Sequence, residues 1–238
     1  MNLLARELGF RKLNEMIRNT NEDVVIDCCY GERFIGSGAE SKTISINGTP
    51  GNALGAYLDG ATIIVNGNAQ DAVGDTMNDG KIVICGNAGD ALGYAMRGGK
   101  IFVKGNTGYR TGIHMKEYRD RKPVIVVGGT VGSFLGEYIA GGIIIVLGLG
   151  TDEFPAGNFT GTGMHGGQIF IRSLKKPKYL PKQVCVSLAD ISDISSIKEY
   201  LSEFSELFGI GMDVILEKPF YKLTPNAKNP YKQMYTYN

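Results

Sequence analysis

The sequence predicts an all-β protein, a single-stranded parallel β-helix of about seven turns with helical and extended segments at its ends. Two columns of glycines recur in steps of 19 residues, and every step also carries an apolar triplet. Periods of about 20 residues are typical of solenoids, in which each repeat buries its apolar side only against its neighbours. The first glycine column holds Gly48, Gly67, Gly86 and Gly105, and the second holds Gly55, Gly74, Gly93 and Gly112.

The apolar triplets mark the expected strands. They lie at residues 44–46, 63–65, 82–84, 101–103, 125–127, 144–146 and 169–171. A leucine-rich repeat would show leucines and an asparagine at fixed positions, whereas these triplets are rich in β-branched residues and are separated by glycine turns. A parallel β-helix fits better, because its short strands stack on the equivalent strands of the turn below at about 4.8 Å.

Stacking places equivalent residues in columns along the axis. One column is aliphatic at every turn and is predicted to lie in the interior: Leu58, Met77, Met96, Met115, Ile139 and Met164. The next column is mostly polar and is predicted to face solvent: Asp59, Asn78, Arg97, Lys116, Ala140 and His165. A third, of Asn68, Asn87 and Asn106, predicts a ladder of side-chain amides that bond along the axis.

The chain divides into a helical flank (1–21), the repeat (22–172) and a C-terminal helix with an extended tail (173–238). We expect the C-terminal helix to begin with Ser192 as N-cap and to end at Gly209. Successive residues of a strand point to opposite faces, so an apolar triplet cannot lie wholly inside. The N-terminal helix, the tail or another polypeptide should therefore cover an apolar outer face of the sheet.

Composition excludes several classes of partner. The 25 basic and 24 acidic residues leave a formal charge of +1, which supplies no field for nucleic acid or an anionic membrane. The longest apolar stretch, which starts at Ile143, is far shorter than the roughly 20 residues that span a bilayer. The N-terminus resembles an amphipathic helix and not a secretory signal. We therefore expect a cytoplasmic protein whose four cysteines are reduced.

No catalytic, cofactor-binding or metal-binding constellation stands out. The residues considered were His114, His165, Asp71, Asp90, Cys28 and Cys29. The histidines have no partner cluster, and the adjacent cysteines suit neither a metal nor a redox pair. The two aspartates stack one turn apart like an acid/base pair, but asparagine, tyrosine and serine share their column, so it is interpreted as a polar turn position. The glycine turns recur in every repeat, unlike a phosphate-binding loop.

Two insertions interrupt the period and are candidate docking loops. The first, at residues 116–121, carries charges of both signs, and the second, at 151–159, offers Phe154 and Phe159 as apolar anchors. Insertions in a solenoid loop out from its surface. A loop that only contacts solvent is the alternative for both.

Several turns, "GNAQDAVGDTMNDGKIVI", "GNAGDALGYAMRGGKIFV" and "GTGMHGGQIFIR" among them, resemble a known repeat domain. This domain is named for its G-x-x-G-x-x-x-G motif and closes the large subunit of glutamate synthase. The resemblance covers about residues 22–172, including the late insertions. The same repeats occur in one of the subunits of formylmethanofuran dehydrogenase, which stays as an alternative.

The resemblance implies a right-handed parallel β-helix in the form of a separate subunit, with no catalytic residues of its own. It implies partner chains for the glutaminase and synthase parts, which would hold FMN and iron–sulfur clusters and form glutamate from glutamine and 2-oxoglutarate. This chain starts with Met1-Asn2 in place of the cysteine nucleophile, and no site residue of the family carries over. Self-association is left open. A self-sufficient β-helix enzyme is disfavoured, because left-handed acyltransferase coils repeat near six residues and 19 is not a multiple of six.

Overall fold

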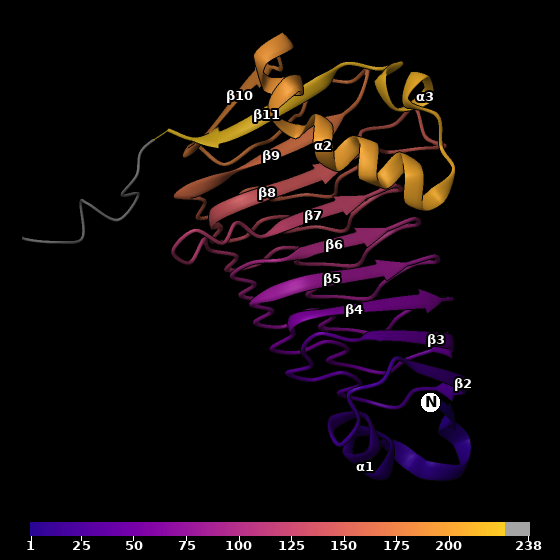
Figure 1. Cartoon of the computed structure of the whole chain (residues 1–238). Helices are drawn as coiled ribbons and strands as arrows, with labels where there is room; N and C mark the ends of the chain where they lie inside the picture. Colours follow the sequence, from indigo (N-terminus) through magenta and orange to yellow (C-terminus); the bar gives the residue numbers. More distant parts are fainter. Residues whose placement is uncertain (227–238) are drawn as a thin grey trace, which may run out of the picture.

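The computed structural model describes residues 1–226 and is a parallel β-helix (Figure 1). One strand from each turn stacks on the next in chain order. These strands are β2 (Val24–Tyr30), β3 (Thr43–Thr49), β4 (Asp59–Asn66), β5 (Asp79–Ile84), β6 (Lys100–Val103), β7 (Val124–Val127), β8 (Ala140–Val146) and β9 (Gly166–Arg172). Paired residues lie one period apart, as in Ile63↔Ile82 and Ile82↔Ile101.

The solenoid has about eight turns, one more than the seven triplets predict, because β2 precedes the first triplet. Its residues pair with β3 at a spacing of 20, as in Val24↔Ile44, and the register shifts between Ile26 and Cys29. The irregular spacing hides this turn from a search at a strict period.

The predicted columns are confirmed. All six members of the aliphatic column are completely buried, and none of the six residues of the polar column is buried. Interiors are packed as densely as organic crystals, so each methionine fills a space of fixed size between its neighbours above and below.

The second glycine column is required by packing. Gly93 has a φ of +69°, and a Cβ atom there would lie 2.5 Å from Cδ1 of Ile125 in the next turn. The left-handed backbone alone does not require glycine, because Ala91 and Ala95 on either side have φ values of +55° and +50°. Their N–H groups donate to Tyr109 O at 2.8 Å and Ile113 O at 2.9 Å in the next turn. Hydrogen bonds between turns therefore hold non-glycine residues in an unfavourable conformation.

The asparagine ladder forms mainly between side-chain oxygens and backbone N–H groups. Oδ1 of Asn68 accepts the N–H of Asn87 at 2.8 Å, and Oδ1 of Asn87 accepts the N–H of Asn106 at 2.8 Å. A second ladder, which was not predicted, runs through side-chain amides from Asn66 to Asn47 (2.8 Å) and from Asn47 to Asp27 (2.6 Å).

Asn87→Ala should lower the free energy of unfolding by about 1 kcal/mol, because the N–H of Asn106 loses its acceptor and this ladder position is exposed to solvent. Asn78→Ala is the matched control, since no hydrogen bond joins that side chain to the rest of residues 1–226. Urea denaturation of both variants measures the difference. Equal stability of the two variants would mean that water replaces the lost acceptor without cost and that the ladder does not stabilise the fold.

Different elements lie at the two ends of the solenoid. At the N-terminal end β1 (Asn2–Leu4) pairs with β2, and helix α1 (Ala5–Arg18) buries Leu13 and Ile17 against the interior. At the other end β11 (Phe220–Pro225) lies antiparallel on β9, and β10 (Val184–Leu188) lies antiparallel on β11. Part of the predicted extended tail is thus a strand, and the rest of it, 227–238, lies outside the described residues.

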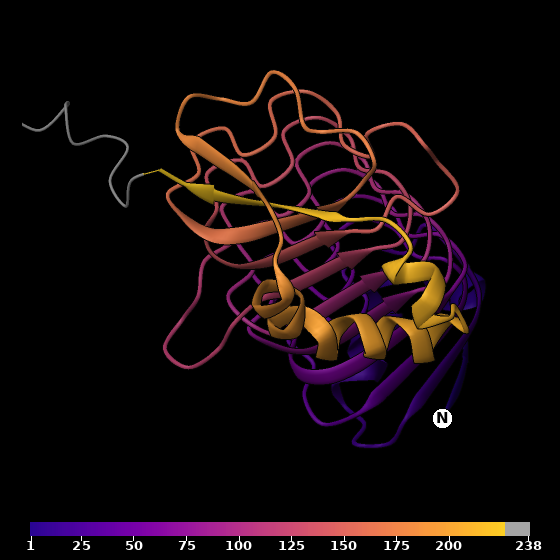
Figure 2. The same ribbon diagram turned by 90° about the horizontal axis from the view of Figure 1, so that it is seen from above.

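Helix α2 (Ile191–Phe208) covers the apolar outer face of the last turns, with the short helix α3 (Met212–Leu216) beside it (Figure 2). The inner side of α2 and the outer side of the strands form a second core: Phe102, Val126, Ile145 and Phe170 from the sheet, with Ile197, Leu201 and Phe204 from the helix. The outer face of β6 to β9 is therefore covered as expected, but by α2 and not by any of the expected candidates, the N-terminal helix, the tail or another polypeptide. None of the helices within residues 1–226 is long and apolar enough to cross a membrane.

The predicted N-cap Ser192 is wrong by two residues. Asp190 caps α2: its side chain accepts the N–H of Asp193 at 2.8 Å, and the Asp193 side chain accepts the N–H of Asp190 at 3.2 Å. This reciprocal capping box satisfies two backbone donors, which a single serine cap would not. The predicted end at Gly209 is confirmed, with a φ of +64°.

Glu203 fastens α2 to the sheet through Lys100 (2.7 Å) and Lys81. Burial by itself would raise the pKa of Glu203, but the hydrogen bonds from both lysines together hold it below its usual value. A lowered carboxyl pKa stabilises the fold above the unfolded-state pKa of about 4.3, and this contribution is lost as pH falls through the folded-state pKa.

Glu203→Gln should therefore lower the melting temperature at pH 7, and the difference from wild type should shrink under acidic conditions below about pH 4. Thermal denaturation of both proteins across this pH range measures it. Glu206→Gln, at an exposed position of the same helix, is the control. A difference that grows toward acid would contradict the assigned role of the lysines.

Candidate interaction surface

The first insertion folds back onto the solenoid. Tyr118 and Arg121 form an antiparallel bridge, and the Arg121 guanidinium reaches Asp59 Oδ1 at 2.6 Å, three turns earlier in the stack. The hydrogen bond to Asp59, together with its charge, raises the pKa of Arg121. Glu117 accepts the N–H of Gly142 at 3.0 Å. This loop is thus held against the wall of the solenoid at both of its ends.

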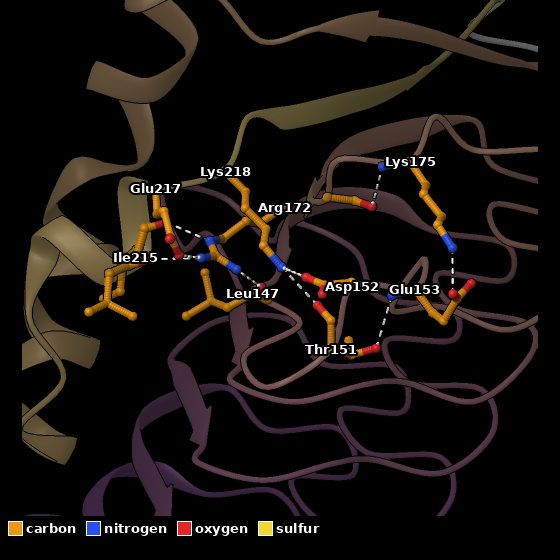
Figure 3. Close-up of polar contacts among 11 residues, drawn as sticks. Leu147, Thr151, Asp152, Glu153, Arg172, Lys175, Ile215, Glu217 and Lys218 are labelled. Atoms are coloured by element: carbon orange, nitrogen blue, oxygen red, sulfur yellow. Dashed lines mark hydrogen bonds and ion pairs between the residues drawn. The ribbon is translucent and has the colours of Figure 1, made fainter.

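The second insertion is fixed to the C-terminal segment (Figure 3). Lys218 Nζ donates to Asp152 Oδ1 at 2.6 Å and to the carbonyl oxygen of Thr151 at 2.9 Å, and Lys175 pairs with Glu153. The hydrogen bond from Lys218 lowers the pKa of Asp152. These contacts give the loop a defined conformation.

The two phenylalanines proposed as anchors have different environments. Phe154 is half-buried and packs against the interior cluster, so it already has a structural role within the chain. Phe159 is 55% exposed and stacks on Phe134, with ring centroids 5.0 Å apart. Only Phe159 is available as an anchor for a partner.

Arg172 joins the last turns to α3 (Figure 3). Its side chain is 3% exposed, and it donates to the carbonyl oxygens of Leu147 (3.1 Å), Val214 (2.7 Å) and Ile215 (2.9 Å). Glu217 lies 3.4 Å from the same guanidinium. Burial lowers the pKa of Arg172. These bonds to three of the chain's own carbonyl oxygens give the buried cation a structural role, which is to join the last turns to α3.

Two groups of stacked side chains lie on four successive turns, and together we call them the aromatic ridge. Tyr94, His114 and Tyr138 form one group, and Arg110, Phe134 and Phe159 form the other. All except Tyr94 have a positive φ, which repeats at equivalent positions of each turn. The stacked turns impose this left-handed conformation, and it determines the direction in which these side chains project from the backbone.

The ridge is held by its own contacts. The His114 ring stacks on Tyr138 at 5.2 Å and meets the edge of Tyr94 at 5.9 Å. The Arg110 guanidinium lies 5.1 Å from the Phe134 ring centroid, and its Nε is 3.1 Å from a Glu137 carboxylate oxygen. Preorganised tyrosine, phenylalanine and arginine side chains are the residue types that dominate binding at protein interfaces.

The residues considered for chemistry are dispersed. His114 lies in the ridge, whereas His165 Nδ1 lies 3.1 Å from the Gly163 carbonyl oxygen in the polar column. Each of the two stacked aspartates accepts the N–H of the residue one turn ahead: Asp71 from Asp90 at 2.9 Å, and Asp90 from Tyr109 at 2.8 Å. These carboxylates serve as ladder acceptors, as the turn interpretation of their column predicts.

The cysteines and the possible metal ligands were examined in the same way. Burial, and then the neighbouring Glu32, raises the pKa of Cys29 to about 12, so this thiol is not poised as a nucleophile. All four cysteines are free thiols in the structure. Across residues 1–226, no group of three or more His, Cys, Asp or Glu side chains is arranged to hold a metal ion.

Comparison with known proteins identifies the repeat. Residues 11–226 match the sequence model of the GXGXG motif family, from within α1 through the whole solenoid to the end of β11. The chain belongs to the GXGXG motif family. This is the type of domain that closes the large subunit of glutamate synthase. A relative in the family, an uncharacterized protein of Methanocaldococcus jannaschii, is 44% identical over 247 aligned positions, which cover 98% of this chain and 95% of the relative.

Proposed function

We propose that this GXGXG chain is a non-catalytic structural subunit of a glutamate synthase, which forms glutamate from glutamine and 2-oxoglutarate. Its family membership over residues 11–226 carries the proposal. In this role it scaffolds a glutaminase chain and a synthase chain, and those chains hold FMN and iron–sulfur clusters. The relative's length supports a separate subunit, because the two proteins align over nearly their whole chains.

The use of the polar side chains agrees with a scaffold. In the solenoid, the Asn and Asp columns bond to backbone groups of adjacent turns, and Glu203 and Arg172 fasten the C-terminal helices to it. These polar groups stabilise the stacked turns through bonds within the chain. The features left for recognition are surface features, foremost the aromatic ridge.

The aromatic ridge is the proposed docking surface for the synthase chain. It combines exposed aromatic area with an arginine on one side of the solenoid, and neighbouring turns hold these side chains in place. An interface built on such groups needs little side-chain ordering, which is a major cost of association. Of the second insertion, only Phe159 takes part.

Replacing both Arg110 and Phe159 by alanine should raise the dissociation constant for the synthase chain by about 30-fold or more, since two important interface residues typically contribute at least about 1 kcal/mol each and every 1.4 kcal/mol is tenfold. Titration calorimetry or surface plasmon resonance with the purified synthase chain measures it. Arg97→Ala, at an exposed position of the polar column, is the control and should bind as wild type does. Unchanged affinity in the double variant would remove the ridge from the interface and transfer docking to another face.

A second candidate is the equivalent scaffold in a complex of the formylmethanofuran dehydrogenase type, because the same repeats occur there. The two candidates differ in the partner chains and in their metals. Flavin with iron–sulfur clusters in the native complex supports glutamate synthase, and molybdenum or tungsten supports the alternative.

A further inference from the structure

Strand β10 is the last strand of the sheet, and one of its edges is unpaired within residues 1–226. Gln183 and Ala189 bond to the residues opposite them on the β11 side, Asn226 and Phe220. Hydrogen-bonded and non-bonded pairs alternate along an antiparallel ladder. The N–H and C=O groups of Val186 and Leu188, at even positions between these two, therefore point away from β11 toward the open edge.

The interior of the solenoid also ends open at β10. Val184 follows Ile169 in the interior column, since a Cβ on Gly161 would lie 2.8 Å from the Val184 side chain, just as a Cβ on Gly136 would meet Ile169. Val184 and Val186 are only half-buried, and Leu188 is 61% exposed. A further strand on this edge would cover all three side chains.

This edge lacks the usual protection against pairing. Natural edge strands carry charges, prolines or bulges, or are very short. β10 reads Val-Cys-Val-Ser-Leu over five residues, without a charge or a proline. At the opposite end of the sheet, β1 has three residues and leads directly into α1.

We propose that β10 pairs antiparallel with β10 of a second copy of this chain, which joins two solenoids end to end about a two-fold axis at Val186. In this register Val184 faces Leu188 of the second copy, so apolar side chains meet apolar side chains. Lys182 faces Asp190 of the second copy, and both residues are exposed. A two-fold interface requires that residues at equal distances before and after the axis be complementary to each other, and β10 meets this condition about Val186.

The start of α2 contributes to the same contact. In Figure 1 its first turn stands beyond β10 at the end of the solenoid, and Ile191 in that turn is 87% exposed. Across the two-fold axis this turn lies next to the residues that lead into the partner's β10. The two helix starts thus add apolar area on either side of the paired strands.

Analytical ultracentrifugation of the full chain tests the pairing. The wild type should sediment as a dimer of its 25.7 kDa chain at micromolar concentration. Val186→Pro should give a monomer with an unchanged fold, because the N–H that it removes points away from β11. Lys182→Asp should weaken the dimer about tenfold or more by opposing Asp190, whereas Lys176→Asp, at another exposed lysine of the same segment, should not.

Cysteine crosslinking tests the register without depending on the fold of the proline variant. Residues 185 and 187 of the two copies form a non-hydrogen-bonded pair, whose Cα atoms lie about 4.5 Å apart and within disulfide range. Ser187→Cys should therefore crosslink with Cys185 of the second copy under mild oxidation and run as a covalent dimer. Gln183→Cys, which faces residue 189, should not crosslink.

A wild-type chain that stays monomeric would overturn the proposal and leave the edge to a strand of a partner subunit. A dimer that tolerates Lys182→Asp and fails to crosslink through Ser187→Cys would overturn it too, because the contact would then use another face. Equal crosslinking of the two cysteine variants would contradict the two-fold register. These results are independent of the proposed glutamate synthase role, which concerns other chains.

Discussion

Met96→Asp should unfold the solenoid. Met96 is completely buried, between Met77 and Met115 in the interior column. A carboxylate at this depth would lie among the apolar side chains of the interior cluster, and burying it there costs several kcal/mol, which is comparable with the whole stability of a domain. The expected result is a chain without a cooperative thermal transition at neutral pH, measured by circular dichroism.

Arg97→Asp is the matched control, because it introduces the same side chain one residue later at an exposed position. Its melting temperature should stay within about 2 °C of wild type, as for most surface substitutions. His165→Ala, in the same polar column, should be similarly silent. Comparable losses from Met96→Asp and Arg97→Asp would show that the columns are assigned to the wrong faces.

Gly93→Ala should be the next most damaging change, with an expected loss of about 2–4 kcal/mol in the free energy of unfolding. A left-handed φ costs an alanine about 1 kcal/mol or slightly more, and overpacking adds about 1–3 kcal/mol. The added methyl group would lie 2.5 Å from Cδ1 of Ile125, which is itself packed inside the stack.

Gly209→Ala separates the two causes, since Gly209 has a φ of +64° and a Cβ atom added there would meet no atom within 4 Å. It should lose only about 1 kcal/mol, the conformational part. Urea denaturation of both variants gives the difference. If Gly209→Ala cost as much as Gly93→Ala, packing between turns would not explain the glycine column.

The repeated features of this protein are the ones that its sequence predicts well. The glycine columns, the methionine stack and the asparagine ladder each recur at 19 residues, so every turn is independent support for the same assignment. The turn at β2 escapes prediction because its spacing is irregular. Strand β10 and its antiparallel partner β11 escape prediction because the segments that contain them have no period and their pairing depends on long-range contacts.

The aromatic ridge shows which features of this protein cannot be predicted from its sequence. The sequence singles out Phe159 as an anchor, but not its stacking on Phe134 or the stacking of His114 on Tyr138. These contacts depend on left-handed backbone at residues that are not glycine, and no local sequence signal marks them. Hydrogen bonds to the adjacent turns impose that conformation, so it follows from the assembled stack and not from the residues themselves.

The decisive test of the proposed subunit role is isolation of the native complex that contains this chain, with identification of its partner chains and an assay of the purified material. If this chain is a glutamate synthase subunit, the complex should contain a glutaminase chain and a flavin-containing synthase chain and should form glutamate from glutamine and 2-oxoglutarate. This chain alone should be colourless and inactive. A complex with molybdenum or tungsten and no glutamate-forming activity would contradict the proposed role, as would glutaminase or glutamate-forming activity from the isolated chain.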